Sequence, residues 1–156
     1  MIDKATIVIT LGAFPETFER IKEHLTRAIK RGVRVNLLTY GKVDLNGARI
    51  TLLPIKNNMV ITWKGQQLNL VVDGQESLIS SFNLKTKQIY HASWSTNIYL
   101  SGVLHRLFLF EHTLNEIMSI KDSNKKLERI ERILKNQEFF HNSDIPAFKL
   151  LWEKHK

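Results

Sequence analysis

The first 40 residues contain the pattern that most restricts the fold of this chain. Residues Ala5–Leu11 form a β-branched apolar run, which is typical of a strand buried on both faces. A helix is predicted after it, because Pro15 suits a first helical position and apolar side chains then recur at helical spacing as far as Ile29. Gly32 suits the C-terminal cap, and a second apolar strand follows over Val33–Tyr40. The pattern predicts a parallel strand pair joined by a right-handed helical crossover, which is typical of the α/β class.

A series of short strands is predicted next. Turn residues separate most of the apolar segments, and strands are expected at Arg49–Leu53, Met59–Lys64, Leu68–Val72, Ser77–Phe82 and Ile89–Trp94. From about Asn97 the spacing becomes helical. A broad apolar face is predicted there, made of Leu100, Val103, Leu104, Leu107, Leu109, Phe110, Leu114, Ile117 and Met118.

Two further helices are expected after this apolar helix. Residues Asp122–Phe140 predict a helix with a mixed-charge outer face, and Ile145–Trp152 predict a short amphipathic one. We therefore divide the chain into a domain over residues 4–120 and a helical extension over residues 121–156 that packs on the same domain.

Composition limits the class of protein. At 156 residues the chain is long enough for one self-standing core. It contains no Cys, which excludes a disulfide scaffold and a thiolate zinc site. The first residues lack the features of a signal peptide, and there is no run of about 18 apolar residues to cross a membrane. We expect a soluble, cytoplasmic protein.

The net charge of +8 suggests a nucleic-acid partner, but its distribution favours another explanation. Residues 1–60 carry 10 basic and 5 acidic side chains, whereas residues 61–120 carry 4 of each. The densest basic cluster, Lys30, Arg31 and Arg34, falls at a predicted helix end, where cations interact favourably with the helix dipole. We expect these side chains to be solvated.

The segment from residue 66 to residue 83 resembles a catalytic motif without its catalytic groups. Members of the phospholipase D superfamily carry His-x-Lys, four residues, Asp, and then a small-Ser-x-Asn turn. Asp73 and the Ser81–Asn83 turn match this spacing, but Gln66 and Leu68 occupy the positions of the His and the Lys. An amide and an alkyl chain cannot attack phosphorus or hold phosphoryl oxygens, so the resemblance implies a site without turnover. Alternatively, Asp73-Gly74 is an ordinary hairpin turn.

Three further segments resemble the phospholipase-D-like module of TrmB-type transcription regulators, over roughly residues 4–120. They are Lys30–Leu38, Val72–Leu78 and the Ala92-Ser93-Trp94 sequence that leads into the apolar helix. The resemblance implies a mixed sheet flanked by helices, with a helical C-terminus here. It also implies an intracellular regulator in which this module forms a homodimer and binds a small-molecule effector, a sugar in characterised members.

The chain departs from the family plan at both ends. A first strand by residue 5 leaves no room upstream for a winged helix-turn-helix, so we expect DNA binding only through a domain that is not on this chain. Sugar-binding archaeal members have a β-rich C-terminal portion, whereas residues 121–156 here have helical spacing. That difference puts sugar specificity in doubt.

The resemblance implies a ligand site around the degenerate motif, where polar side chains would approach one another. The candidate ligand-binding residues are Gln66, Asp73, Ser81, Asn83, Trp94, Thr96 and Asn97. Each has an ordinary alternative.

The alternatives are structural roles for the same side chains. Ser95, Thr96 or Asn97 suits a helix N-cap, and Trp94 suits the core. Ser81 and Asn83 suit turns, and Asp73 without a Lys partner must be exposed or find other donors.

The histidines predict neither a nucleophile nor a metal site. His91 is a poor candidate for a substitute nucleophile, and His105 and His112 are too far apart on their helix to share a metal without other ligands. We expect no catalytic residue, metal or cofactor.

Three functions remain open at this point. The leading one is a non-catalytic effector-binding and dimerisation module of a TrmB-like transcription regulator. The second is a phosphodiesterase or nuclease of the phospholipase D superfamily that acts as a dimer, and the third is an interaction scaffold without a small-molecule ligand.

Overall fold

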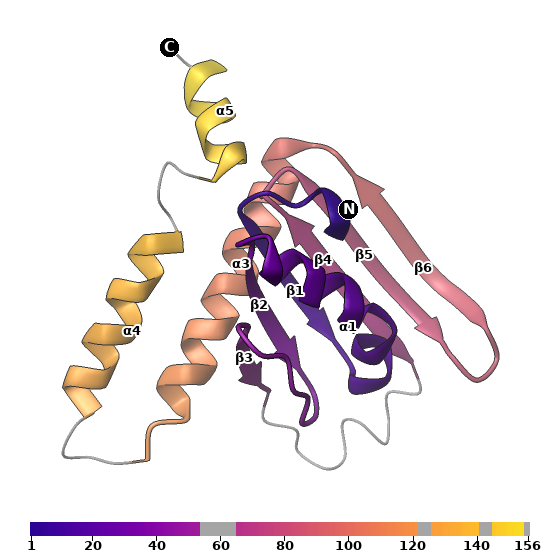
Figure 1. The fold of residues 1–156 in the computed structure, drawn as a ribbon, viewed down its shortest axis with the longest axis horizontal. Coiled ribbons are helices and arrows are strands. Elements are labelled where there is room, and N and C mark those ends of the chain that lie inside the picture. Colours follow the sequence, from indigo (N-terminus) through magenta and orange to yellow (C-terminus); the bar gives the residue numbers. More distant parts are fainter. Residues whose placement is uncertain (54–64, 122–125, 141–144, 155–156) are drawn as a thin grey trace.

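Six strands form one sheet in the order β3-β2-β1-β4-β5-β6 (Figure 1). The computed structural model describes residues 1–53, 65–121, 126–140 and 145–154. The strands are β1 (Val8–Ala13), β2 (Arg34–Thr39), β3 (Arg49–Leu52), β4 (Gln66–Val72), β5 (Glu76–Asn83) and β6 (Gln88–Ser95). The helices are η1 (Ile2–Lys4), α1 (Pro15–Lys30), α3 (Ile98–Met118), α4 (Lys126–Phe140) and α5 (Pro146–Lys154). β1, β2 and β3 are parallel, whereas β4, β5 and β6 each run antiparallel to the strand before them in this order, so the sheet is mixed.

The predicted strand-helix-strand unit is present at the N-terminus. β1 and β2 pair in parallel from Val8 opposite Arg34 to Ala13 opposite Thr39, and α1 connects them. Gly32 follows α1 with a φ of 88°, a left-handed conformation that glycine adopts without strain. The first strand begins at Val8 rather than Ala5, because the amides before it bond to a side chain instead of to a neighbouring strand.

The other predicted elements agree with the structure to within about two residues where they can be compared. The expected strand Met59–Lys64 lies outside the described residues, as does the start of the expected helix Asp122–Phe140. β6 is an edge strand with seven of its eight residues exposed. No helix among the described residues is both long and apolar enough to cross a membrane.

The face of the sheet covered by α1 holds the main apolar core. Phe18, Leu25 and Ala28 of α1 are fully buried. They belong to one cluster with side chains of the central strands, which are Ile9, Leu11, Ala13, Val35, Leu37, Leu70 and Val72. Burial of this apolar surface is the main driving force for the fold.

The opposite face, covered by α3, is more polar (Figure 1). Four side-chain pairs join α3 to the sheet: His105 Nδ1 with Thr10 Oγ1 (3.1 Å), His112 Nδ1 with Thr51 Oγ1 (2.8 Å), Ser101 Oγ with Ser77 Oγ (3.1 Å), and Glu116 with Arg49. The Arg49 guanidinium donates to both Glu116 oxygens, at 2.7 and 2.6 Å. Charge-assisted bidentate pairs of this kind fix geometry, so the rotation of α3 on the sheet is well defined.

The short helix α5 packs against the turn between β4 and β5. The Ala147 N–H donates to the Asp73 carbonyl oxygen at 3.4 Å, and Ile145 and Ala147 are buried in a cluster with Val8. Gly74 in that turn has a φ of 65°. The proposed division between residues 120 and 121 stays a prediction.

Candidate functional site

The two degenerate motif positions on β4 face α1. The Thr17 hydroxyl donates to Gln66 Oε1 at 3.0 Å, and Gln66 Nε2 donates to Glu16 at 3.3 Å. Leu68 packs against the core cluster on the α1 side of the sheet. Because side chains alternate along a strand, the residues between and after these positions face α3 instead.

Asp73 lies at the other end of β4, where it holds the start of β1. Its carboxylate accepts hydrogen bonds from the Thr6 N–H and hydroxyl, at 2.9 and 2.8 Å, and from the N–H groups of Ile7 and Val8, both at 2.9 Å. The residue is 6% exposed and has a φ of 53°. At about 3.3 Å per residue, its distance from Gln66 along the strand is roughly 23 Å.

Ser81 and Asn83 lie near the end of β5. Ser81 is the cross-strand neighbour of Gln67 and therefore shares the α3 face with it. Asn83 Oδ1 accepts from the N–H groups of Lys85 and Thr86, at 3.0 and 3.2 Å, so this side chain stabilises the turn to β6.

Trp94 and the residues after it lie at the exposed edge of the sheet. Trp94 is 61% exposed and donates from Nε1 to Glu76 at 2.8 Å, so the alternative of a core role was wrong. β6 is the last strand of the sheet in the part of the chain that the structure describes, which explains the exposure. Thr96 is exposed, and Asn97 is the N-cap of α3, with its Oδ1 accepting from the Leu100 N–H at 3.0 Å.

The seven predicted site residues therefore do not form one cluster. Gln66 lies at α1, Asp73 at the opposite end of β4, Ser81 and Asn83 near the end of β5, and Trp94 to Asn97 at the sheet edge. Among them, Ser81 is the cross-strand neighbour of Gln67, which lines a pocket formed by the described residues.

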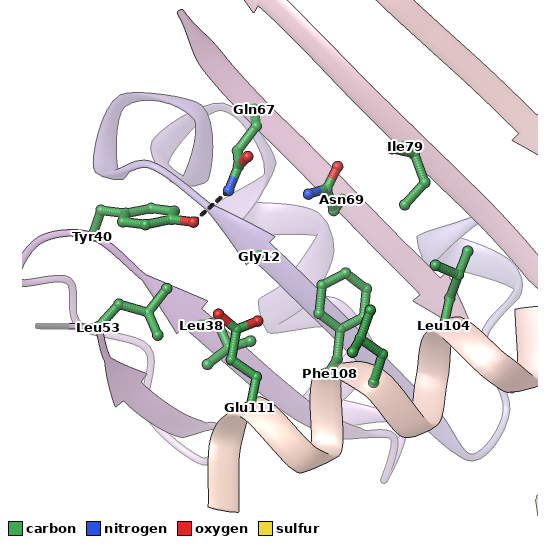
Figure 2. Close-up of a pocket in the computed structure, with 11 residues that line it drawn as sticks. Gly12, Leu38, Tyr40, Leu53, Gln67, Asn69, Ile79, Leu104, Phe108 and Glu111 are labelled. Atoms are coloured by element: carbon green, nitrogen blue, oxygen red, sulfur yellow. Dashed lines mark hydrogen bonds between the residues drawn. The ribbon is translucent and has the colours of Figure 1, made fainter. Parts of the chain in front are cut away.

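That pocket lies between α3 and the ends of the central strands (Figure 2). Its volume is about 250 Å³. The lining residues are Gly12, Leu38, Tyr40, Leu53, Gln67, Asn69, Ile79, Leu104, Leu107, Phe108 and Glu111. The polar side chains come from β4, from the residue after β2 and from α3, and they converge on an otherwise apolar space, as in many small-molecule sites.

The fold holds three of these polar side chains in place, which are Tyr40, Gln67 and Asn69. The Tyr40 ring stacks on Phe14, with 4.5 Å between ring centroids, and Gln67 Nε2 donates to the Tyr40 hydroxyl oxygen at 2.7 Å. Asn69 Oδ1 accepts from the Ser80 N–H at 3.3 Å. Gly12 also lines the pocket, and because it has no side chain the backbone of β1 lies close to the Phe108 ring.

The electrostatics of the pocket depend on Tyr40 and Glu111, because no other titratable side chain among the described residues lines it. Burial raises the pKa of the Glu111 carboxyl above its ordinary value. Burial also raises the pKa of Tyr40, an effect opposed by the hydrogen bond from Gln67 and reinforced by the negative charge of Glu111.

None of these lining residues was among the seven predicted site residues. The signal for Gln67 and Asn69 was available, since period-two alternation places them on the face opposite Gln66 and Leu68. No sequence signal marks Tyr40 or Glu111, which reach the pocket from other elements.

Comparison with known proteins gives the family. The family model described as "Transcriptional regulator TrmB, EBD N-terminal subdomain" matches residues 1–112, where EBD stands for effector-binding domain. No curated protein sequence matches this chain.

Three solved structures are similar to the chain. TrmBL2, described as an archaeal chromatin protein with a novel mode of DNA binding, has a TM-score of 0.50 and 13% identity, over 70% of this chain and 45% of TrmBL2. NucT from Helicobacter pylori has a TM-score of 0.53 and 11% identity, over 73% of this chain and 83% of NucT. Nuc from Salmonella typhimurium, described as a phospholipase D family member, has a TM-score of 0.45 and 18% identity, over 73% of this chain and 82% of Nuc.

The chain thus spans less than half the length of TrmBL2. The predicted mixed sheet with flanking helices and a helical C-terminus is confirmed, and its fold is similar to those of TrmBL2 and NucT. Because the family model covers well over half of its residues, the chain belongs to the TrmB family of transcriptional regulators and corresponds to the N-terminal subdomain of the effector-binding domain.

Proposed function

We propose that this chain is a non-catalytic module of a TrmB-like transcriptional regulator that dimerises and binds its effector in the pocket between α3 and the sheet. The regulator acts inside the cell and contacts DNA through a helix-turn-helix domain outside this chain. The observation that carries the proposal is the convergence of Tyr40, Gln67, Asn69 and Glu111 on one small cavity.

The pocket suits a small ligand. Its volume of about 250 Å³ is close to the lower end of typical ligand sites, which start at roughly 300 Å³. Three of its polar side chains are already held by hydrogen bonds, Tyr40 and Gln67 by each other and Asn69 by Ser80, so little side-chain entropy is lost when a ligand binds. We therefore propose that the effector binds in this pocket rather than among the seven ligand-binding residues predicted from the sequence.

The absence of catalysis is supported by chemistry at two places. Gln66 and Leu68 provide neither a nucleophile nor a cation at the motif positions, and loss of a nucleophile costs about a millionfold in rate. The pocket is lined by no His, Lys, Arg or Cys among the described residues.

Dimerisation is supported by the outer face of α3. Side chains on this face are large, apolar and exposed: Tyr99, Leu100, Val103, Leu107, Phe110, Leu114 and Met118. Exposed apolar patches of this extent mark interaction surfaces in soluble proteins. A second copy packed on this face would cover it.

A ligand screen tests the proposal. Purified protein is heated with sugars, amines and nucleotides, and an effector is expected to raise the unfolding temperature in a concentration-dependent way. If no compound of any class raises the unfolding temperature, the result would support the interaction scaffold instead.

A turnover assay tests the nuclease alternative. We expect no hydrolysis of a generic phosphodiester or of single-stranded DNA by the wild-type protein. Turnover that is abolished by His91→Ala would refute the non-catalytic assignment.

A further inference from the structure

Glu111 places a carboxylate at the pocket without a partner of opposite charge among the described lining residues. Leu104, Leu107, Phe108 and Glu111 recur at helical spacing on α3, and Figure 2 shows the Glu111 side chain directed toward the cavity. Within the described part of the chain, no hydrogen bond or ion pair reaches its carboxylate.

Glu116 on the same helix provides a comparison. The Nε and Nη2 groups of Arg49 donate hydrogen bonds to its two carboxylate oxygens, whereas the Glu111 side chain is directed into an open cavity. Burial of a carboxylate without a partner costs free energy, and the raised pKa of Glu111 reflects that cost. A cation placed beside it would recover part of the cost.

The charge around the cavity selects against anions. Of the lining residues within the described ranges, only Glu111 is charged, although the chain as a whole carries +8. A phosphate or carboxylate ligand would lie next to a like charge in a region of low dielectric constant, where repulsion is strong. Sugar phosphates and nucleotides are therefore disfavoured.

The remaining lining suits a short apolar body. It is provided by Leu38, Leu53, Ile79, Leu104, Leu107 and Phe108. The Phe108 ring can also attract a cation through its π face, and the Tyr40 oxygen can accept a hydrogen bond from an ammonium group.

We infer that the effector of this pocket is a small amine, with its ammonium group bound by the Glu111 carboxylate and its apolar body packed beside Phe108. This inference rests on the proposed function, because it names the ligand class of the same site.

Three ligands that differ only in the head group test the inference by isothermal titration calorimetry. They are 2-phenylethylamine, 2-phenylethanol and phenylacetate, which present a cation, a neutral hydroxyl and an anion on similar skeletons. An ammonium group adds an ion pair to the hydrogen bond that a hydroxyl can also donate to the carboxylate, so we expect the amine to bind about 10-fold more tightly than the alcohol. We expect no measurable binding of phenylacetate.

Two variants assign the preference to Glu111. Glu111→Gln keeps the side-chain shape and should bring amine and alcohol to within about threefold of each other, since the charge that separates them is gone. Glu128→Gln, which changes an exposed carboxylate on α4, should leave the preference intact. Circular dichroism checks that Glu111→Gln is folded, and its unfolding temperature should equal or exceed that of wild type.

The outcomes separate this inference from the proposed function. Equal binding of amine and alcohol, or a preference unchanged in Glu111→Gln, contradicts the amine assignment. Tight binding of a neutral sugar that Glu111→Gln does not weaken overturns the assignment but leaves effector binding in place. If no ligand of any class binds, both proposals fail.

Discussion

Asp73 and Thr6 form a double contact that joins the β4–β5 turn to the start of β1. The Thr6 N–H and hydroxyl both donate to one Asp73 oxygen, at 2.9 and 2.8 Å, and the other oxygen accepts from Ile7 and Val8. Asp73, one of the residues of the predicted motif, therefore has a structural role in this chain.

Asp73→Asn should destabilise the protein substantially. The variant keeps the shape of the side chain but directs an NH2 group at backbone N–H donors, so several hydrogen bonds are lost in a buried site. We expect the free energy of unfolding to fall by about 2–4 kcal/mol, measured by urea denaturation. Asp44→Asn, at an exposed loop position, is the matched control and should be nearly neutral. A loss in Asp73→Asn no larger than in the control would contradict the structural role.

A glycine pair tests the docking of α5. Gly74 and Gly32 both have positive φ, but a Cβ at Gly74 would lie 2.9 Å from the Ala147 Cβ, whereas nothing lies within 4 Å at Gly32. Gly32→Ala should therefore cost only backbone strain, about 1 kcal/mol, and Gly74→Ala should cost about 1–2 kcal/mol more. Equal losses in thermal unfolding would show that α5 does not pack on this turn in solution.

The stability of the protein should decrease in mild acid because of His112. Burial, followed by the charge of Arg49, lowers the pKa of His112 from 6.5 to about 3. The unfolded state therefore takes up the proton first as the pH falls. Stability is retained above about pH 6.5 and decreases by about 1.4 kcal/mol per pH unit below it, until the pH approaches 3.

Urea denaturation across this pH range measures the slope. His112→Gln should reduce it, because the variant has no proton to take up at this position. His91→Gln, at an exposed histidine on β6, should leave it unchanged. If the slope persisted in His112→Gln, other groups would have to account for it.

The proposed dimer should dissociate when charge is placed on the outer face of α3. Phe110 is 64% exposed, so Phe110→Glu should leave the fold of each subunit intact and yet oppose packing of a second copy. We expect light scattering to give a dimeric mass for wild type and a monomeric mass for the variant. Ile89→Glu on β6 is the control, and dissociation by that change alone would place the interface at the sheet edge.

The sequence was sufficient to predict most of the helices and strands and the family, but not how deeply each strand is buried in the sheet. Trp94 lies in a predicted strand and had a plausible core role, but the strand order of the described residues places β6 at the edge of the sheet. The order of strands depends on contacts between distant segments, which periodicity does not report.

The site was harder to predict for a related reason. The motif predicted ligand-binding roles for Gln66 and Asp73, which lie at opposite ends of β4. The pocket instead combines Tyr40, Gln67 and Glu111 from three separate elements. Each is an ordinary residue in its own segment, and their convergence is a property of the tertiary structure alone.

Gly12→Val is the sharpest test of the proposed effector site in the cavity between α3 and the sheet. A Cβ at Gly12 meets Phe108 at an ordinary 3.8 Å, and the added methyl groups are expected to occupy part of the cavity that Gly12 lines. The rise in unfolding temperature that a ligand from the screen produces is measured in wild type and in this variant. We expect Gly12→Val to fold but to lose the ligand-induced rise, and an equal rise in both proteins would exclude this cavity as the site.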